Sequence, residues 1–236
     1  MTDFEARLIK SDTEVYDITE LVTSVDFTDN MNVSGVTTFS MLPGGVRPEE
    51  GNGIQIISGG LTICGYIFKL GYTAAKDVKL TVYDQLRYLK ASDTYVFEDK
   101  TASQIVQALC TAFGLRTGFI EDTRHPLGIM TFDNKPMLDM VADCVTKTLV
   151  EKKQLYYLRD NAGRVEFRNI QNCVSDLEVD TKPDSPLFGF SYERDIDSDT
   201  YNQIKLARDN KETGRREIFM TKDSGNIKKW GHAAVL

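Results

Sequence analysis

Apolar and polar residues alternate through the first third of the chain. In Val78–Tyr83 every second residue is aliphatic, which is the period of a strand with one buried face. Val36–Leu42 is rich in β-branched residues and ends at the break Pro43-Gly44-Gly45. The other expected strands are Val15–Val25, Gly53–Ile57 and Leu61–Leu70. Short strands with glycine-rich breaks between them predict a sandwich or a small barrel.

The pattern changes to a helical period after Phe97. Thr101 and Gln104 have the spacing of a capping box, apolar residues then recur at helical spacing, and Gly114 stands where a helix ends. A second helix is expected to start near Pro136, because proline suits the first turn and an apolar stripe follows it. The sequence therefore predicts two amphipathic helices here.

A hairpin and a second β-rich region complete the pattern. The hairpin is expected to pair Gln154–Arg159 with Arg164–Arg168 around a turn at Asp160–Gly163. An acidic, proline-containing stretch, Cys173–Pro186, is expected to be a connector. The elements expected after it are strands Leu187–Tyr192, Gln203–Ala207 and Arg216–Thr221, a turn at Asn210–Gly214 and a helix over Asp223–Trp230.

These elements predict a β-rich α+β protein with three domains. Residues 1–92 form the first β domain, residues 93–175 an inserted α+β domain with two helices and a hairpin, and residues 176–236 a second β domain. Three strands cannot close a barrel. The last domain is therefore expected to be truncated or to be completed by a partner.

Composition and charge exclude some functions. Of the 236 residues 41% are hydrophobic and 27% charged, which suits a globular protein with a real core. The net charge of −7 argues against a surface that holds nucleic acid by counterion release. No apolar run approaches the roughly 18 residues that cross a membrane. Met1–Arg7 has no apolar signal region, so secretion by the usual route is not expected.

Cysteine and histidine offer little chemistry. The four cysteines are widely spaced and are expected to be small buried hydrophobes in a reducing compartment: Cys64, Cys110, Cys144 and Cys173. His125 and His232 have no second histidine nearby, so each is interpreted as an exposed loop residue rather than a metal ligand. A Cys–His nucleophile pair remains open in three dimensions, although no local motif supports it.

Acidic and aromatic residues do not change this picture. The densest acidic cluster, Asp195, Asp197 and Asp199, is interpreted as turn and cap residues, and it lacks the glycine that a calcium loop requires. Trp230 and the tyrosines, including the pair Tyr156–Tyr157, are expected to serve packing rather than sugar binding. The sequence thus assigns no catalytic, cofactor-binding or metal-binding residue and implies no cofactor.

The stretch Tyr83–Phe97 marks a seam between two domains. A strand ends in it, a short helical turn follows, and a further element is expected from Tyr95. Leu86 and Leu89 are expected to plug the end of the first barrel, while Arg87 and Lys90 stay in water.

The seam also carries a family resemblance. Together with the Thr101 helix and the stretches Ser191–Leu206, Asp209–Gly214 and Asp223–Gly231, it resembles the XkdQ-type baseplate hub proteins of contractile-tailed phages and phage-like particles. That family is similar to the central baseplate hub of long-tailed phages. The resemblance covers nearly the whole chain, and its motifs are structural.

The resemblance implies a mechanical role without turnover. Hubs of this type form a homotrimeric ring at the end of the tail tube, and each subunit carries two tube-like β-barrels. Six barrels then match a six-fold tube to a three-fold spike. The implied partners are further copies of the chain, the tail tube protein and spike or other central baseplate proteins, with DNA or cargo only passing through the channel. The implied location is the baseplate of a virion or phage-tail-like particle assembled in the host bacterial cytoplasm. Family members usually continue past the position of Leu236, which leaves the second barrel in doubt.

Two other functions remain open. A tail-associated peptidoglycan hydrolase would have to use the Asp195–Asp199 cluster, or Cys110 or Cys144 with His125. A cell-wall-binding module would have to be built on residues 96–172. We expect no clearing of bacterial cell walls in a zymogram.

Overall fold

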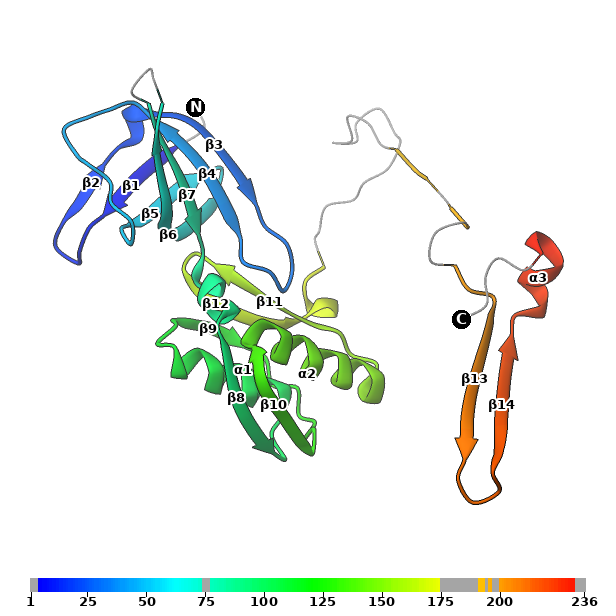
Figure 1. Cartoon of the computed structure of the whole chain (residues 1–236). Coiled ribbons are helices and arrows are strands. Elements are labelled where there is room, and N and C mark those ends of the chain that lie inside the picture. The colour runs from blue at the N-terminus through cyan, green and yellow to red at the C-terminus, as the bar shows by residue number, and fades with distance from the viewer. Residues whose placement is uncertain (1–3, 74–76, 175–190, 194, 197–199, 232–236) are drawn as a thin grey trace. The chain divides into compact units, whose positions relative to one another are not determined.

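The chain folds into two compact units, Met1–Ser175 and Asp176–Leu236. The computed structural model describes residues 4–73, 77–174, 191–193, 195–196 and 200–231. Figure 1 shows that the first unit joins a curved β-sheet to a part that contains two helices.

The curved sheet has seven strands in the order β2-β1-β5-β6-β7-β4-β3, and all neighbours are antiparallel. Its strands are β1 (Glu5–Ile9), β2 (Val15–Asp17), β3 (Val22–Thr28), β4 (Val36–Met41), β5 (Gly53–Ser58), β6 (Leu61–Tyr72) and β7 (Val78–Tyr83). The predicted alternation is confirmed in β7, where Val78, Leu80 and Val82 are all buried. These side chains belong to one hydrophobic cluster, which we call the sheet core. It also contains Leu8, Phe39 and Ile56.

The predicted strand Val15–Val25 is wrong as a single element. A 3-10 turn, η1 (Thr19–Leu21), interrupts it, because the Asp17 carboxylate accepts from the Thr19 N–H at 2.9 Å and the Ile18 N–H donates to the carbonyl of Ala6. The chain thereby passes from β2 at one edge of the sheet to β3 at the other. Among the described residues no ladder joins these two edges, so the sheet is curved but does not close into a barrel.

The helical part of the first unit has its own core. Its two-stranded sheet pairs β10 with β8, and its three-stranded sheet has the order β11-β12-β9 with β12 and β9 parallel. The elements are β8 (Ser92–Glu98), α1 (Ala102–Ala112), β9 (Thr117–Ile120), β10 (Ile129–Pro136), α2 (Met137–Lys152), β11 (Tyr156–Asn161), β12 (Arg164–Asn169) and the 3-10 turn η3 (Ile170–Asn172). The faces of α1 and α2 that meet the sheets form the α+β core, which includes Ile105, Val141 and Phe167.

Local signals gave these helices correctly. The capping box of Thr101 and Gln104 is present, and Gly114 follows α1 with a φ of +63°. The helix α2 begins at Met137, one residue later than expected, with Pro136 at its N-cap. The hairpin is confirmed, although its turn is shorter than expected because β11 extends to Asn161 and only Ala162 and Gly163 turn, both at positive φ.

The short helix between the two cores, η2 (Gln85–Lys90), corrects one expectation. Leu86 and Leu89 are fully buried, but they belong to the α+β core and not to the sheet core. They therefore do not plug a barrel. They anchor the segment after β7 in the helical part. The next strand starts at Ser92 rather than at Tyr95.

The second unit contains a two-stranded antiparallel ribbon and a helix. The strands β13 (Gln203–Asn210) and β14 (Arg215–Lys222) extend beyond the predicted limits, and α3 (Ser224–Trp230) follows them. The Asp223 carboxylate caps α3 by accepting from the N–H groups of Gly225 and Asn226. Of the predicted strand Leu187–Tyr192, residues 187–190 lie outside the described residues, and Ser191 and Tyr192 are not in a strand. Most of the predicted connector Cys173–Pro186 also lies outside them.

The predicted fold class, β-rich α+β, is confirmed. In the part of the chain that the structure describes, no helix is both long enough and apolar enough to cross a bilayer.

Candidate functional site

The most strongly organised polar site lies where β7 passes into η2, between the sheet core and the α+β core. Asp84 is 9% exposed, and its carboxylate accepts from the Gly35 N–H at 2.7 Å, the Ser34 hydroxyl at 2.9 Å and the Leu86 N–H at 3.0 Å. One side chain thus caps η2 and holds the loop that precedes β4. We call this region the junction.

Gln85 extends the junction to the three-stranded sheet. Its Oε1 accepts from the Arg116 N–H at 2.9 Å, and its Nε2 donates to the Gly163 carbonyl at 2.6 Å and to Asp160 at 3.1 Å. Both ends of the amide are therefore used. Since a glutamine offers a donor and an acceptor, it can bind two different loops without an unpaired atom.

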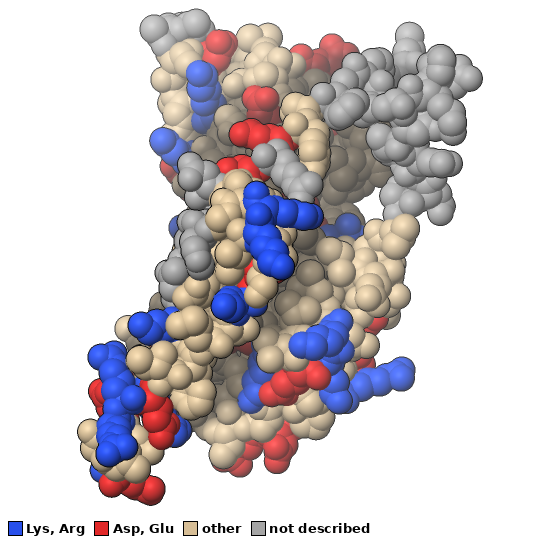
Figure 2. Space-filling model, turned by 90° about the vertical axis from the view of Figure 1, so that its right-hand side faces the viewer, with Lys and Arg blue, Asp and Glu red and all other residues tan. Residues whose placement is uncertain are grey.

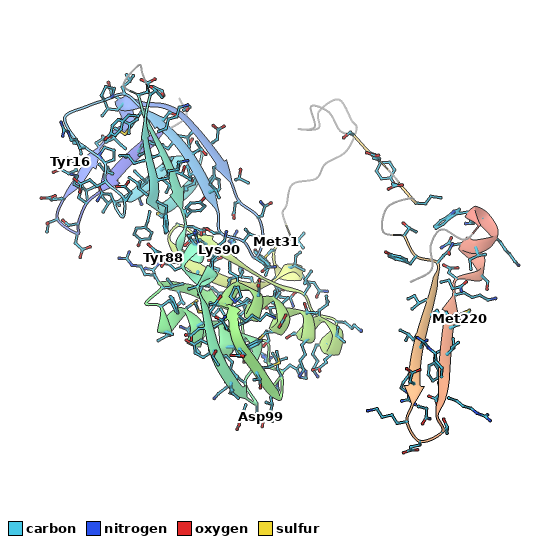
Figure 3. The ribbon with its side chains drawn as sticks, viewed as in Figure 1. Tyr16, Met31, Tyr88, Lys90, Asp99 and Met220 are labelled. Atoms are coloured by element: carbon cyan, nitrogen blue, oxygen red, sulfur yellow. The ribbon has the colours of Figure 1, made fainter. Side chains whose placement is uncertain are left out.

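Asn32 connects the same two parts from the β3–β4 loop. Its backbone N–H donates to the Leu158 carbonyl at 2.9 Å, and its Oδ1 accepts from the Leu158 N–H at 2.7 Å. Asn32 has a φ of +62°, a conformation that asparagine tolerates better than most residues. One residue thus pairs with the free edge of β11, and its neighbour Met31 lies at the same loop in Figure 3.

We expect Asn32→Ala to lower the free energy of unfolding of the first unit by about 1–2 kcal/mol, because the buried N–H of Leu158 loses its acceptor and alanine is strained at positive φ. Asn32→Asp keeps both the acceptor and the conformation and serves as the matched control. Hydrogen exchange at the Leu158 amide reads out the local effect. Equal exchange in Asn32→Ala and the parent protein would show that this clamp does not hold.

Arg87 is not simply solvated as the sequence suggested. Its guanidinium carbon lies 5.6 Å from the ring centroids of both Phe68 and Tyr83, and the side chain is half-buried. Tyr88 packs edge-on against Tyr66 with ring centroids 5.9 Å apart. Lys90 is exposed, as expected; Figure 3 shows Tyr88 and Lys90 projecting from η2.

Burial sets the electrostatics of the junction. It raises the pKa of Asp84 from its ordinary 3.8 to about 6, against the opposing effect of the hydrogen bonds from Gly35 and Ser34. Burial also raises the pKa of Asp160, and that of Asp29, which faces Arg159. Three aspartates with raised pKa values therefore lie around one contact between the two cores.

This arrangement predicts that the first unit gains stability as the pH falls. The folded state binds the Asp84 proton more tightly than the unfolded chain, so the contribution is full below the unfolded pKa of 3.8 and is lost as the pH rises through about 6. We expect a gain of about 1–1.5 kcal/mol between about pH 7.5 and pH 5 in urea unfolding followed by far-UV circular dichroism. Asp84→Asn should remove most of this dependence. A stability that is flat or falls over that range would contradict the prediction.

The buried cysteines do not provide a nucleophile. Cys110 and Cys144 are fully buried in the α+β core, as expected, and burial raises the pKa of each thiol to about 12. Burial also raises the pKa of the half-buried Cys64. Cys173 accepts from the Tyr157 hydroxyl. A thiol is reactive as the thiolate, so Cys110 and Cys144 lack the environment that nucleophilic catalysis needs.

His125 is paired with a carboxylate rather than with a thiol. Its Nε2 hydrogen-bonds Glu151 at the end of α2, and this bond holds the pKa of Glu151 below its ordinary value. His232, Asp197 and Asp199 lie outside the described residues. Within the described ranges no three histidine, cysteine or carboxylate side chains converge as metal ligands.

Packing explains the paired tyrosines, as the sequence suggested. Tyr156 is buried and stacks on Phe167 with centroids 5.3 Å apart, and Tyr157 is buried on the other side of β11. On the face that Figure 2 presents, both basic and acidic side chains occur.

The fold is similar to that of two prophage tail proteins and of a chain in a VgrG complex. The 43 kDa tail protein of prophage MuSo2 from Shewanella oneidensis matches with a TM-score of 0.52 and 19% identity over 69% of this chain and 53% of that one. Prophage tail protein gp18 from Listeria monocytogenes EGD-e matches with a TM-score of 0.60 and 11% identity over 98% and 71%. A chain of the half-lidded Francisella PdpA–VgrG complex matches with a TM-score of 0.58 and 12% identity over 95% and 42%.

The sequence also matches a family model. Residues 25–233 match the YQBQ-like family, and the chain belongs to that family. A search of curated protein sequences finds no match. The chain spans about half the length of the Shewanella tail protein and less than half of the Francisella chain.

Proposed function

We propose that this chain is a structural subunit of a phage or phage-tail-like baseplate hub. In this role it joins the tail tube to the central spike, adapts six-fold to three-fold symmetry as a homotrimer and lines part of the central channel. Its partners are further copies of itself, the tube protein and the spike, and DNA or cargo only passes through. The chain catalyses no reaction, and its location is the baseplate of the particle. Membership of the YQBQ-like family and the phage tail fold support this proposal.

The observation that carries it is the ribbon of β13 and β14. Five large apolar side chains on the ribbon are 38–64% exposed: Ile204, Leu206, Ile218, Phe219 and Met220. Leu206 lies opposite Phe219 on one face, and Met220 and Ile218 lie on the other, so both faces are apolar. An isolated two-stranded ribbon is marginal in water. Such a ribbon is suited to be completed by further strands, as a subunit that folds fully only in an assembly requires.

The first unit supports the same role in another way. Asp84, Gln85 and Asn32 bind the curved sheet to the helical part through several loops at once. A connection of this kind resists bending between the two parts, which is useful to an adaptor that carries load between a tube and a spike.

The test is reconstitution. The full-length protein, alone and with the tube protein, should give a three-fold ring in electron microscopy and a trimer mass in light scattering. A strictly monomeric protein that does not join the tube would refute the assembly. Leu206→Ser and Phe219→Ser should weaken assembly, whereas Lys211→Ser in the ribbon turn is the matched control.

A cell-wall zymogram tests the enzymatic alternative. The burial of Cys110 and Cys144 argues against a thiol hydrolase. His125, the histidine that such a thiol would need as its base, is instead hydrogen-bonded to Glu151. We expect no clearing, and clearing that persists in the purified protein would overturn the structural assignment.

A further inference from the structure

A groove of about 860 Å³ lies on the helical part of the first unit, apart from the junction. It forms where the parallel strands β9 and β12 end, because the chain leaves both strands in the same direction and diverges into the loops after Ile120 and Asn169. Crevices at the carboxyl ends of adjacent parallel strands are common sites for ligands. Phe119, at 56% exposed, lines this groove.

The acidic groups of the groove are already engaged. Glu121 accepts from the Asn169 N–H at 2.9 Å and from the Asn172 amide at 2.6 Å, which ties the two loops together. Asp122 accepts from the Arg124 N–H at 2.9 Å and from the Ser103 hydroxyl at 3.2 Å. The hydrogen bonds of these carboxylates therefore hold together the loops that form the walls of the groove.

The basic side chains of the groove have fewer ion-pair and hydrogen-bond partners than its carboxylates. Within the described ranges, no carboxylate lies within ion-pair distance of Arg124 or Lys152. Arg168 reaches Glu166 only at 3.9 Å, because Arg159 binds that carboxylate at 2.9 Å. The Nε of Arg168 is buried without a hydrogen-bond partner, and its guanidinium carbon lies 5.5 Å from the Phe119 ring centroid.

We propose that this groove binds an acidic, extended peptide segment of a protein partner. The three cations complement carboxylates, and a guanidinium binds a carboxylate with directed hydrogen bonds. The amide of Gln171 offers a donor and an acceptor, and the amide of Gln154, whose Oε1 accepts from the Tyr156 hydroxyl at 3.4 Å, offers its donors; these groups match a peptide backbone. A nucleic acid fits less well, since Glu121 and Asp122 lie in the same groove and would repel a continuous phosphate backbone.

The experiment is fluorescence anisotropy of the full chain with a fluorescein-labelled peptide of alternating glutamate and serine. We expect salt-sensitive binding that weakens about five- to tenfold in the double variant Arg124→Gln/Lys152→Gln, since each lost exposed ion pair contributes modestly. Lys90→Gln removes one exposed charge outside the groove and is the matched control. It should bind as the parent protein does.

Two other probes complete the test. A lysine–serine peptide should not bind, and a single-stranded oligothymidine should bind more weakly than the acidic peptide. The proposal is overturned by no acidic-peptide binding at millimolar concentration, by an equal loss in Lys90→Gln and the double variant, or by tighter binding of the oligonucleotide. The groove belongs to the first unit, whereas the hub proposal rests on the ribbon, so either can fail alone.

Discussion

Asp84→Ala is expected to lower the free energy of unfolding of the first unit by about 3–5 kcal/mol, the larger of the two main effects. The substitution leaves the N–H groups of Gly35 and Leu86 and the hydroxyl of Ser34 without their acceptor in a buried place. Denaturant unfolding of the full chain, followed by far-UV circular dichroism, measures the change. Because the chain's one tryptophan, Trp230, lies in the second unit, tryptophan fluorescence follows that unit separately.

Asp12→Ala is the control for this prediction. Asp12 is an exposed aspartate of the same unit, so its removal should change stability by less than about 0.5 kcal/mol. If Asp84→Ala and Asp12→Ala lowered the free energy of unfolding equally, the three hydrogen bonds of the Asp84 carboxylate would not stabilise the first unit as expected.

Gly65→Ala is expected to destabilise the curved sheet by about 3 kcal/mol, because a Cβ at this position would meet atoms that cannot move. It would lie 2.6 Å from the Tyr83 carbonyl oxygen and 2.7 Å from a Val82 methyl group. The strands β6 and β7 would have to separate just beside the register shift between Ile67 and Lys69. A thermal scan should show a decrease of the melting temperature of about 6–12 °C.

Gly71→Ala is the matched control, since it lies on the same strand. Its nearest contact would be the Lys79 carbonyl at 4.0 Å, an ordinary packing distance. We expect a melting temperature close to that of the parent protein. Comparable losses in the two variants would mean that the close approach at Gly65 carries no special constraint.

Gly65 and Asp84 both matter for the proposed role as a hub subunit. Gly65 lets β6 approach β7, which ends at Tyr83. The next residue, Asp84, caps the start of η2. The close strand pairing and the fastening thus follow each other along the chain. A subunit that transmits force from one part to the other depends on both, so variants that pass the stability test should also be examined for assembly.

Local sequence signals gave a large part of the fold. The capping box at Thr101, the positive-φ glycine after α1 and the alternation in Val78–Tyr83 each depend on residues a few positions apart. The strand β1 was missed although it alternates, with buried Ala6 and Leu8 beside exposed Glu5 and Arg7. Two other missed strands lacked such signals. The strand β9 has four residues, and β10 carries the polar stretch Asp133–Lys135 with Asn134 at positive φ.

The candidate site was less accessible to sequence reasoning. The sequence drew attention to the stretch Tyr83–Phe97, which lies inside the first unit, but did not identify Asp84, Gln85 and Asn32 as the residues that hold it. Asp84 did carry one local signal, since an aspartate before a helical turn is a typical N-cap. Nothing near Asn32 indicates its partner Leu158, which is 126 positions away.

The sequence by itself determined the β-rich α+β class, the helices with their caps, the burial of Cys110 and Cys144 and the lack of a catalytic motif. Only the tertiary structure decided that the sheet stays open, that Leu86 and Leu89 belong to the α+β core, and that a basic groove forms at the ends of β9 and β12. The reason is physical. Periodicity and capping act within one or two turns of chain, whereas the junction and the groove depend on contacts between residues about 20 to 126 positions apart.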